Sequence, residues 1–226
     1  MSLEVALDGD QSPAMKHTSI GAKRFDALWR RSSPSDGAAV YAELCRRYRA
    51  PYRHFHNLDH IKDCLHHVDE VAPLLDDPDA VELAVWFHDA VYEIGASTNE
   101  RRSAEMFLEL SQNLSARLRR RVCGLILATR HTETPQGNDR RFIVDIDLAG
   151  FGASWDVFMR NGALLRREFA AQTDVQYHKG QVAFLQRLQR RPRFFSTDHF
   201  RDRYEATARE NLQRLLEDLT RRGYAA

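Results

Sequence analysis

Two adjacent residues, His88 and Asp89, lie in a strongly apolar stretch of the sequence. The segment from Leu83 to Val91 is otherwise entirely hydrophobic. Burying an imidazole and a carboxylate costs free energy unless each finds a partner. A divalent cation would be such a partner, and imidazole nitrogen with carboxylate oxygen suits iron, manganese, zinc or cobalt better than calcium. The pair therefore indicates a metal site in the interior of the protein.

Two further groups of residues could share that site. Asp145 and Asp147 are two carboxylates in another apolar segment. His56 and His60 are four residues apart, and Asn57 between them is a good helix N-cap, which would place both rings at one helix start. A single buried histidine or aspartate is more often a packing or capping residue. The three groups together favour a common chemical site.

The order histidine, His-Asp, aspartate resembles the HD superfamily of metal-dependent phosphohydrolases. Several segments are similar to the predicted HD phosphohydrolases of bacteria, and the resemblance covers about residues 20 to 220. It implies an all-α, single-domain helical HD bundle that hydrolyses a nucleotide or other small phosphoester through metal-activated water. The matching segments are FHNLDH at 55–60, WFHDAVY at 86–92, NERRSA at 99–104, ATRH at 128–131, DIDLAGFG at 145–152, REF at 167–169 and ARENL at 208–212.

The resemblance implies a metal-ligand set position by position. His60, His88 and Asp89 match ligands of the family, and a distal aspartate completes the set. We predict Asp147 for that place because its Asp-Leu pair resembles the Asp-Arg/Lys-Leu ending of other members. Asp145 is then a structural or supporting residue, and we keep it among the candidate catalytic residues. Manganese, iron, cobalt, nickel, magnesium and zinc all remain open as the metal.

Candidate acids and bases also follow from the resemblance. The stretch from His56 to His60 is similar to the signature of cyclic nucleotide phosphodiesterases, in which the first histidine protonates the leaving oxygen. This makes His56 a general-acid candidate, although Phe55 stands where those enzymes have tyrosine. Glu93 and Glu100 are possible bases. A capping-box role at the start of a helix would explain Glu100 equally well.

Four residues are candidates for binding the substrate. His131 matches the position from which HD proteins send another histidine into the site, where it could bind a second metal or the phosphoryl group. Its alternative is a histidine stabilised by the dipole of a helix C-terminus. Arg130, Arg167 and Lys179 could contact an anionic substrate.

Three alternatives compete with the phosphohydrolase hypothesis. HD-type di-iron oxygenases share the first three ligands, but they require more histidines before the final aspartate, where this sequence has only His131. A non-catalytic HD module that binds metal or nucleotide would keep the fold without turnover. A helical interaction protein without any metal would leave the buried His-Asp pair unexplained.

Composition narrows the class of protein and its partners. The chain has 226 residues and a formal net charge of +1, so we expect one domain and no general attraction to long nucleic acids or to anionic membranes. Three cysteines, odd in number and far apart, predict reduced thiols and a cytoplasmic protein. No apolar run reaches the roughly 20 residues of a membrane helix. The expected partner is a small phosphorylated molecule, and the oligomeric state stays open.

The periodicity of hydrophobic residues predicts helices almost throughout. Residues 1–18 are polar and mixed and are predicted to be a flexible tail, followed by one helical domain over 19–226. The run at 142–148 is too short and isolated for a sheet and predicts a buried turn or short helix. Longer helices are expected from Pro34, after Asn57, from Asp77-Pro78 to about Tyr92, from Ser97 by a capping box, and over 115–130, 154–171, 174–190 and 197–221.

Overall fold

Helices form all the regular structure in residues 13–224, which the computed structural model describes. This part of the chain contains ten α-helices, two short 3₁₀ helices and no strand, so the predicted all-α single domain is confirmed. The elements are α1 Pro13–Ser32, α2 Ala38–Tyr48, α3 Leu58–Val71, η1 Ala72–Leu74, α4 Pro78–Phe87, α5 Asn99–Leu110, α6 Ala116–Ala128, α7 Asn138–Leu148, η2 Ala149–Gly152, α8 Trp155–Glu168, α9 Asp174–Gln189 and α10 Asp198–Arg221.

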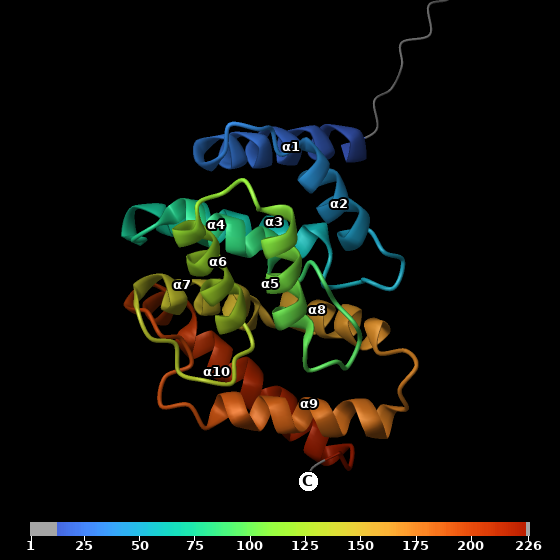
Figure 1. Cartoon of the computed structure of the whole chain (residues 1–226). Coiled ribbons are helices and arrows are strands. Elements are labelled where there is room, and N and C mark those ends of the chain that lie inside the picture. The colour runs from blue at the N-terminus through green and yellow to red at the C-terminus, as the bar shows by residue number, and fades with distance from the viewer. Residues whose placement is uncertain (1–12, 225–226) are drawn as a thin grey trace, which may run out of the picture.

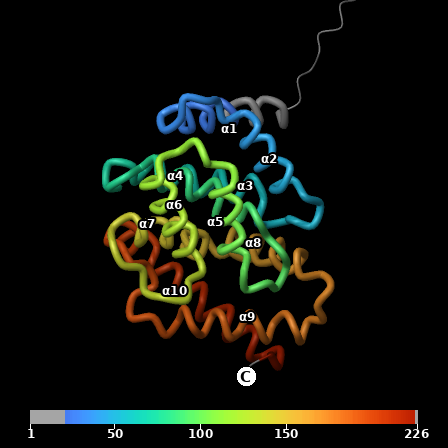
Figure 2. Tube along the Cα trace, in the orientation of Figure 1, coloured from blue at the N-terminus to red at the C-terminus, as the bar shows by residue number. Residues whose placement is uncertain are grey.

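The helix α4 lies at the centre of the bundle. It packs against α1, α3, α5, α6 and α7, and every residue from Ala80 to Phe87 is buried. The helices α1 and α2 lie at one end of the molecule, and α9 and α10 lie at the other (Figures 1 and 2). The helix α10 packs against η2 and α9. The chain therefore delivers His88, at the C-terminus of α4, into the middle of the protein.

Local sequence signals account for the start of the two helices that matter most for the site. The Asn57 side chain caps α3 by accepting hydrogen bonds from the backbone N–H groups of Asp59 and His60, at 2.8 and 3.4 Å. The Asp77 side chain caps α4 by accepting from Ala80 N at 3.1 Å. Both caps were predicted, and each satisfies backbone donors that a helix start leaves unpaired.

The helix α4 ends at Phe87, earlier than the predicted end near Tyr92. The cause is a contact from outside the helix. The guanidinium of Arg53 donates to the backbone carbonyls of Asp89 and Ala90, at 2.6 and 3.1 Å, and so satisfies groups that a continuing helix would have used. The chain turns there, and the side chains of His88 and Asp89 lie together, with His88 Nε2 3.1 Å from Asp89 Oδ2.

Other boundaries also differ from the sequence prediction. The helix α1 begins at Pro13, inside the segment predicted to be a tail; residues 1–12 lie outside the described part. The helix α2 begins at Ala38 rather than at Pro34, and α7 begins at Asn138, before the run at 142–148 that was predicted to be a buried turn or short helix. The predicted capping box of α5 is not formed, because Thr98 makes no side-chain cap hydrogen bond and the Asn99 side chain binds backbone groups of Glu93, at 2.9 and 2.8 Å.

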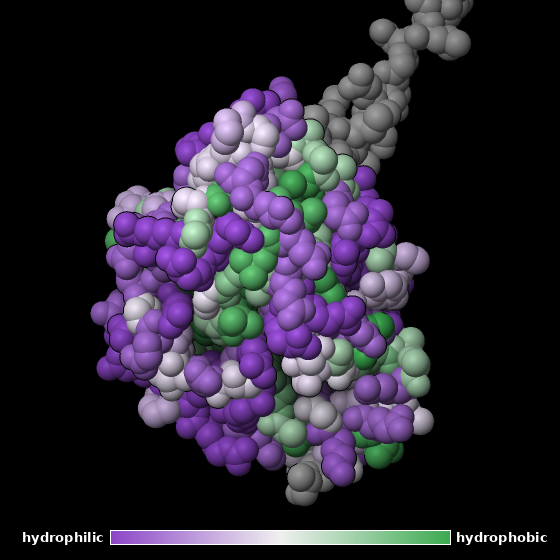
Figure 3. All heavy atoms as spheres, in the orientation of Figure 1, coloured by the Kyte–Doolittle hydropathy of each residue, from purple (hydrophilic) through white to green (hydrophobic). Residues whose placement is uncertain are grey.

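Aromatic side chains fill the core on both sides of α4. The rings of Phe25, Trp29, Tyr41 and Trp86 contact one another beneath α1, with centroids 5.5 to 5.8 Å apart. Burying each such side chain contributes about 1.5–3 kcal/mol. On the face seen in Figure 3, hydrophobic residues gather in a strip between hydrophilic flanks. None of the helices in the described residues is long and apolar enough to cross a membrane.

Candidate metal centre

Three side chains from three helices converge at the centre of the bundle. His60 lies in the first turn of α3, His88 at the C-terminus of α4, and Asp147 near the end of α7. One ligand atom of each lies within 4.8 Å of the others. The two Nε2 atoms are 3.3 Å apart, and Asp147 Oδ1 lies 3.3 Å from His60 Nε2 and 3.5 Å from His88 Nε2.

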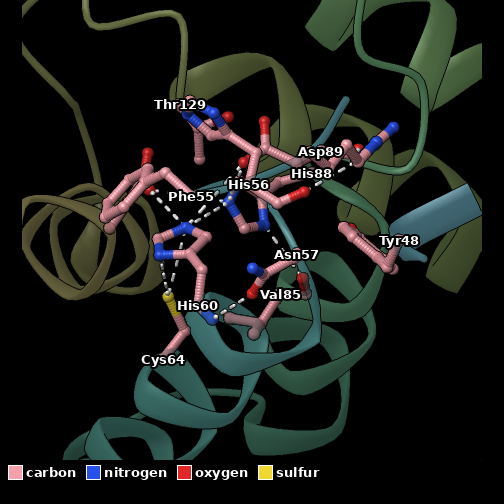
Figure 4. Close-up of polar contacts among 12 residues, drawn as sticks. Tyr48, Phe55, His56, Asn57, His60, Cys64, Val85, His88, Asp89 and Thr129 are labelled. Carbon is pink, nitrogen blue, oxygen red and sulfur yellow. Dashed lines mark hydrogen bonds and ion pairs between the residues drawn. The ribbon is translucent and has the colours of Figure 1, made fainter. Parts of the chain in front are cut away.

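Asp89 brings a fourth donor to this cluster, as Figure 4 shows for its side chain beside His88 and His60. Its Oδ2 atom lies 3.1 Å from His88 Nε2 and 3.8 Å from His60 Nε2. Donors about 2.1 Å from one cation are roughly 3.0 to 3.4 Å apart in octahedral or tetrahedral geometry. The separations in the protein lie close to this range. His60, His88 and Asp147 therefore have the donor types and the spacing to hold one divalent ion, and the Asp89 carboxylate lies beside the two histidines. We call these four residues the metal-ligand cluster.

The protonation of His88 supports this reading of the metal-ligand cluster. Its Nδ1 lies 2.9 Å from the carbonyl oxygen of Val85, a contact that requires Nδ1–H to donate. The neutral ring then presents the lone pair of Nε2 to the cluster, as metal-binding histidines do. Burial lowers the pKa of His88, but Asp89 and Asp147 outweigh it and raise that pKa well above its ordinary value. The site is thus strongly attractive to positive charge.

His131 reaches the same place from the end of α6. Its Nε2 lies 2.8 Å from Asp147 Oδ2, and its Nδ1 is buried without a hydrogen-bond partner. The backbone at His131 has φ 56°, in the left-handed region that costs a non-glycine residue roughly 1–2 kcal/mol. Arg191 holds it there by donating to the His131 carbonyl at 2.8 Å. The structure therefore places His131 in the site, as the sequence predicted.

His56 is oriented by Glu168, a residue that the sequence analysis did not select. The Glu168 side chain is fully buried, and its Oε2 lies 2.6 Å from His56 Nδ1. Its Oε1 accepts hydrogen bonds from the backbone N–H groups of Phe55 and His56, both at 2.8 Å. Burial raises the pKa of Glu168, but these hydrogen bonds and the His56 charge outweigh it and lower that pKa below its ordinary value. A carboxylate held this way fixes the orientation of the His56 ring.

Arg53 is the second residue of the site that sequence reasoning missed. It is buried, and its guanidinium lies over the rings of Tyr48 and Tyr92, at 5.1 and 5.4 Å from their centroids. Tyr92 in turn stacks on His56, with ring centroids 4.2 Å apart. No local pattern marks Arg53, because two of its three carbonyl partners, Asp89 and Ala90, are distant in sequence and only His56 is near.

Of the two candidate bases, the structure brings Glu100 to the site and leaves Glu93 outside. Glu100 lines the cavity beside Asp89. Burial raises the pKa of Glu100 above its ordinary value, with a further increase from Asp89. Glu93 is exposed and binds Arg102 at 2.7 Å on the surface.

Asp145 does not lie in the site, which corrects its place among the candidate catalytic residues. Its carboxylate is completely buried and accepts hydrogen bonds from the N–H groups of Ser196 and Thr197 and from the Thr197 hydroxyl, at 2.7 to 3.0 Å. Successive residues of a helix are about 100° apart, so Asp145 and Asp147 point to nearly opposite sides of α7. Asp145 therefore joins α7 to the start of α10.

The three predicted cationic substrate ligands are also placed outside the site. Arg130, Arg167 and Lys179 are exposed and do not line the cavity described below. Arg167 precedes Glu168 on α8, so when Glu168 faces His56 its neighbour faces solvent. Arg130 still lies close enough to Glu100 to oppose the rise in its pKa.

A cavity of about 490 Å³ opens from the metal-ligand cluster towards α8, α9 and α10. His56, Asp89, Glu100, His131 and Asp147 line it at the cluster, and mainly apolar side chains line the remainder. The candidate acid, the candidate base and two of the four metal-ligand residues thus face one enclosed space.

Comparison with protein-family models, with curated proteins and with solved structures finds no match for this chain. Membership of the HD superfamily therefore stays a prediction from the sequence segments. The geometry of the metal-ligand cluster and of its cavity is the basis on which a function can be assigned.

Proposed function

We propose that this chain is an HD-type, metal-dependent phosphohydrolase. The observation that carries the proposal is the convergence of two imidazoles and two carboxylates, from α3, α4 and α7, at the inner end of a cavity. His56 and Glu100, with a hydrogen-bonded partner and a raised pKa respectively, line the same cavity. This combination suits hydrolysis of a phosphoester that enters from the cavity.

His60, His88, Asp89 and Asp147 would hold the ion. A divalent ion bound there would supply Lewis acidity towards a phosphoryl oxygen and would lower the pKa of water. His131 contacts Asp147 Oδ2 through Nε2 and lines the cavity, so its ring lies beside the place proposed for the phosphoryl group. The residues therefore bring positive charge to the place where the phosphoryl group reacts.

We assign the two proton transfers of the reaction to His56, as the acid, and to Glu100, as the base. His56 donates Nδ1–H to Glu168, and this contact turns the opposite ring nitrogen away from Glu168. The opposite nitrogen can then give its proton to the leaving alcohol as the phosphorus–oxygen bond breaks. Glu100, whose pKa burial raises, accepts a proton from the attacking water.

Metal content is the first test, with two histidine variants of the same helix. We expect purified wild-type protein to hold about one divalent ion per chain, and His60→Ala to lose it. His67→Ala is the matched control, because His67 is also on α3 but binds Glu70 outside the metal-ligand cluster, at 3.0 Å. Elemental analysis measures this, and release of phosphate or alcohol from phosphomonoesters and phosphodiesters measures activity with each metal.

Different outcomes would overturn different parts of the proposal. Two irons per chain with consumption of oxygen would indicate a di-iron oxygenase. A bound ion with no hydrolysis of any phosphoester would indicate a binding module. Wild-type protein that takes up no ion after incubation with manganese or iron would remove the metal site itself.

A further inference from the structure

The cavity behind the metal-ligand cluster is much larger than a phosphoryl group requires. Its volume of about 490 Å³ lies in the range that encloses whole drug-sized ligands, roughly 300–1,000 Å³. Most of this space must therefore hold the body of the substrate, by which we mean everything except its phosphoryl group. The residues that line the walls indicate the chemistry of that body. Away from the cluster the walls include Phe151, Phe158, Leu165, Phe184 and Leu215.

The positive charges beside this cavity are already neutralised by the protein. Arg166 and Arg222 are the arginines of its lining in the described chain. The Arg166 guanidinium donates to the Asp174 carboxylate at 2.8 Å and to the carbonyls of Phe169 and Gln172, at 2.8 and 3.0 Å. Arg222 lies 3.6 Å from the Asp218 carboxylate. These groups do not supply the free cations that a chain of phosphates would require.

Neutral polar side chains interrupt the apolar wall, and they include Asn161, Gln181 and Tyr177. Tyr177 is buried, and its hydroxyl has no hydrogen-bond partner. Burial raises the pKa of Tyr177 to about 12, so the hydroxyl stays uncharged at ordinary pH. A buried hydroxyl without a partner costs free energy until a ligand supplies one.

We propose that the substrate is an amphipathic phosphomonoester: its single phosphate lies at the metal-ligand cluster and its apolar body fills the cavity between α8, α9 and α10. The inference rests on the proposed function and names its substrate class. The apolar walls remove the body from water, and the single ion site with His131 accommodates one phosphate. A nucleoside polyphosphate would leave its additional phosphate charges without free cationic partners, because Arg166 and Arg222 already bind groups of the protein.

Two glycines provide a matched pair of variants. Gly162 on α8 lines the cavity, and a Cβ added there meets no atom within 4 Å, so Gly162→Leu places a side chain in the cavity without a backbone clash. Gly180 on α9 has the same open surroundings but is exposed and does not line the cavity. Gly180→Leu therefore controls for the change of glycine to leucine in a helix.

The test is hydrolysis of ethyl, butyl, hexyl and octyl phosphate, beside a deoxynucleoside monophosphate and triphosphate, by the manganese-loaded protein. Each added methylene that enters the cavity is expected to raise kcat/KM about threefold to fourfold. The gain with chain length should disappear in Gly162→Leu and persist in Gly180→Leu. Nucleotides should be hydrolysed with a lower kcat/KM than octyl phosphate.

A binding measurement separates failure of this inference from failure of the proposed function. Non-hydrolysable alkyl phosphonates are titrated against the manganese-loaded wild type and both glycine variants by calorimetry. Affinity that rises with chain length in the absence of any turnover would support the apolar site and overturn the phosphohydrolase. Turnover of phosphoesters by the wild type with no dependence on chain length, or with nucleotides preferred over octyl phosphate, would overturn the substrate class and keep the phosphohydrolase.

Discussion

At the scale of single residues, the proposed hydrolysis depends on the carboxylate of Glu168, which orients the imidazole of His56. His56 and Glu168 are 112 residues apart in sequence, yet they form one of the shortest contacts of the site, at 2.6 Å. Glu168 is a positioning residue in the proposed reaction, because it acts on the substrate only through His56. Its own orientation is fixed by the two backbone N–H groups that bind its other oxygen.

Replacing Glu168 by glutamine should reduce turnover without removing the metal. We expect kcat to fall about 10- to 100-fold with little change in KM, less than the roughly 10²- to 10⁴-fold that loss of a general acid causes. In a His56→Asn background, Glu168→Gln should cause no further fall in kcat, because Glu168 acts on the substrate only through His56. Steady-state kinetics of the two single variants and the double variant measure this; independent, multiplicative effects would contradict it.

Glu168 should also affect stability in a pH-dependent way. Its pKa is lowered in the folded protein from an ordinary value of 4.5, so its ionised form favours folding. That stabilisation is fully present above about pH 4.5 and is lost as the pH falls through the lower, folded-state pKa. Urea unfolding should therefore show Glu168→Gln destabilised by about 1.5–3 kcal/mol at pH 7, with a smaller difference from wild type at pH 3.5 to 4. A difference that grows on acidification would contradict the assignment.

At the scale of elements, the end of α4 determines where the His-Asp pair points. The helix stops because Arg53, from the loop before α3, takes over the carbonyls of Asp89 and Ala90. This contact joins the segment that carries His56 to the segment that carries His88 and Asp89. Two segments of the site thus share one buried guanidinium.

Replacing Arg53 by methionine should therefore affect folding and metal binding together. We expect a loss of about 2–4 kcal/mol in the free energy of unfolding, because buried carbonyls lose their donors. Metal affinity should fall with it, and Arg53→Lys should not restore either, because an ammonium cannot bind several carbonyls in the same geometry. Arg46→Met is the control, since Arg46 makes an exposed pair with Glu43 and its loss should cost about 0.5 kcal/mol or less. Urea unfolding and metal titration measure both effects.

The elements show which features the sequence could predict. The caps Asn57 and Asp77 act on backbone groups within three residues, so their own neighbourhood reveals them. The residues that end α4 and orient His56 could not be found in this way. Arg53 and Glu168 act across 36 and 112 residues, and only the packed helices bring their partners together.

The candidate site shows the same division. Its central residues could be found because histidine and aspartate are unusual in apolar helices. A charged residue on the surface carries no such signal. The sequence therefore favours Arg167 as a substrate ligand, whereas the structure places its neighbour Glu168 at the site. Asp147 could be separated from Asp145 only by resemblance, and the helical rotation between them shows that one carboxylate faces the metal-ligand cluster and the other faces α10.

At the scale of the whole molecule, the metal-ligand cluster joins α3, α4 and α7 at the centre of the bundle. Two carboxylates and the histidines around them are buried there, and the pKa of Asp147, which burial alone would raise, is held well below its ordinary value mainly by His88 and His131. An ion that binds only the folded chain would stabilise it by mass action. The metal should therefore contribute to the stability of the protein as well as to its reaction.

Removal of the metal should lower Tm. At a free ion concentration about 100 times Kd, binding contributes about 2.7 kcal/mol, which corresponds to a shift of roughly 5–10 °C for a domain of this size. Scanning calorimetry with and without a chelator measures the shift, and adding the metal back should reverse it. His60→Ala should not respond to the chelator, and His67→Ala should respond like wild type. A wild-type Tm that stays the same after demonstrated metal loss would contradict this role.

The order of the helices along the chain has a consequence for how the protein is made. Every residue of the metal-ligand cluster lies at or before Asp147, whereas Glu168 and the helices α8 to α10, which form the apolar wall, are synthesised afterwards. At about 5–20 residues per second, a ribosome releases the whole ligand set roughly 4 to 15 s before the last of that wall. The nascent chain can therefore acquire its ion while the centre is still open to solvent, and the enclosing helices fold over it later.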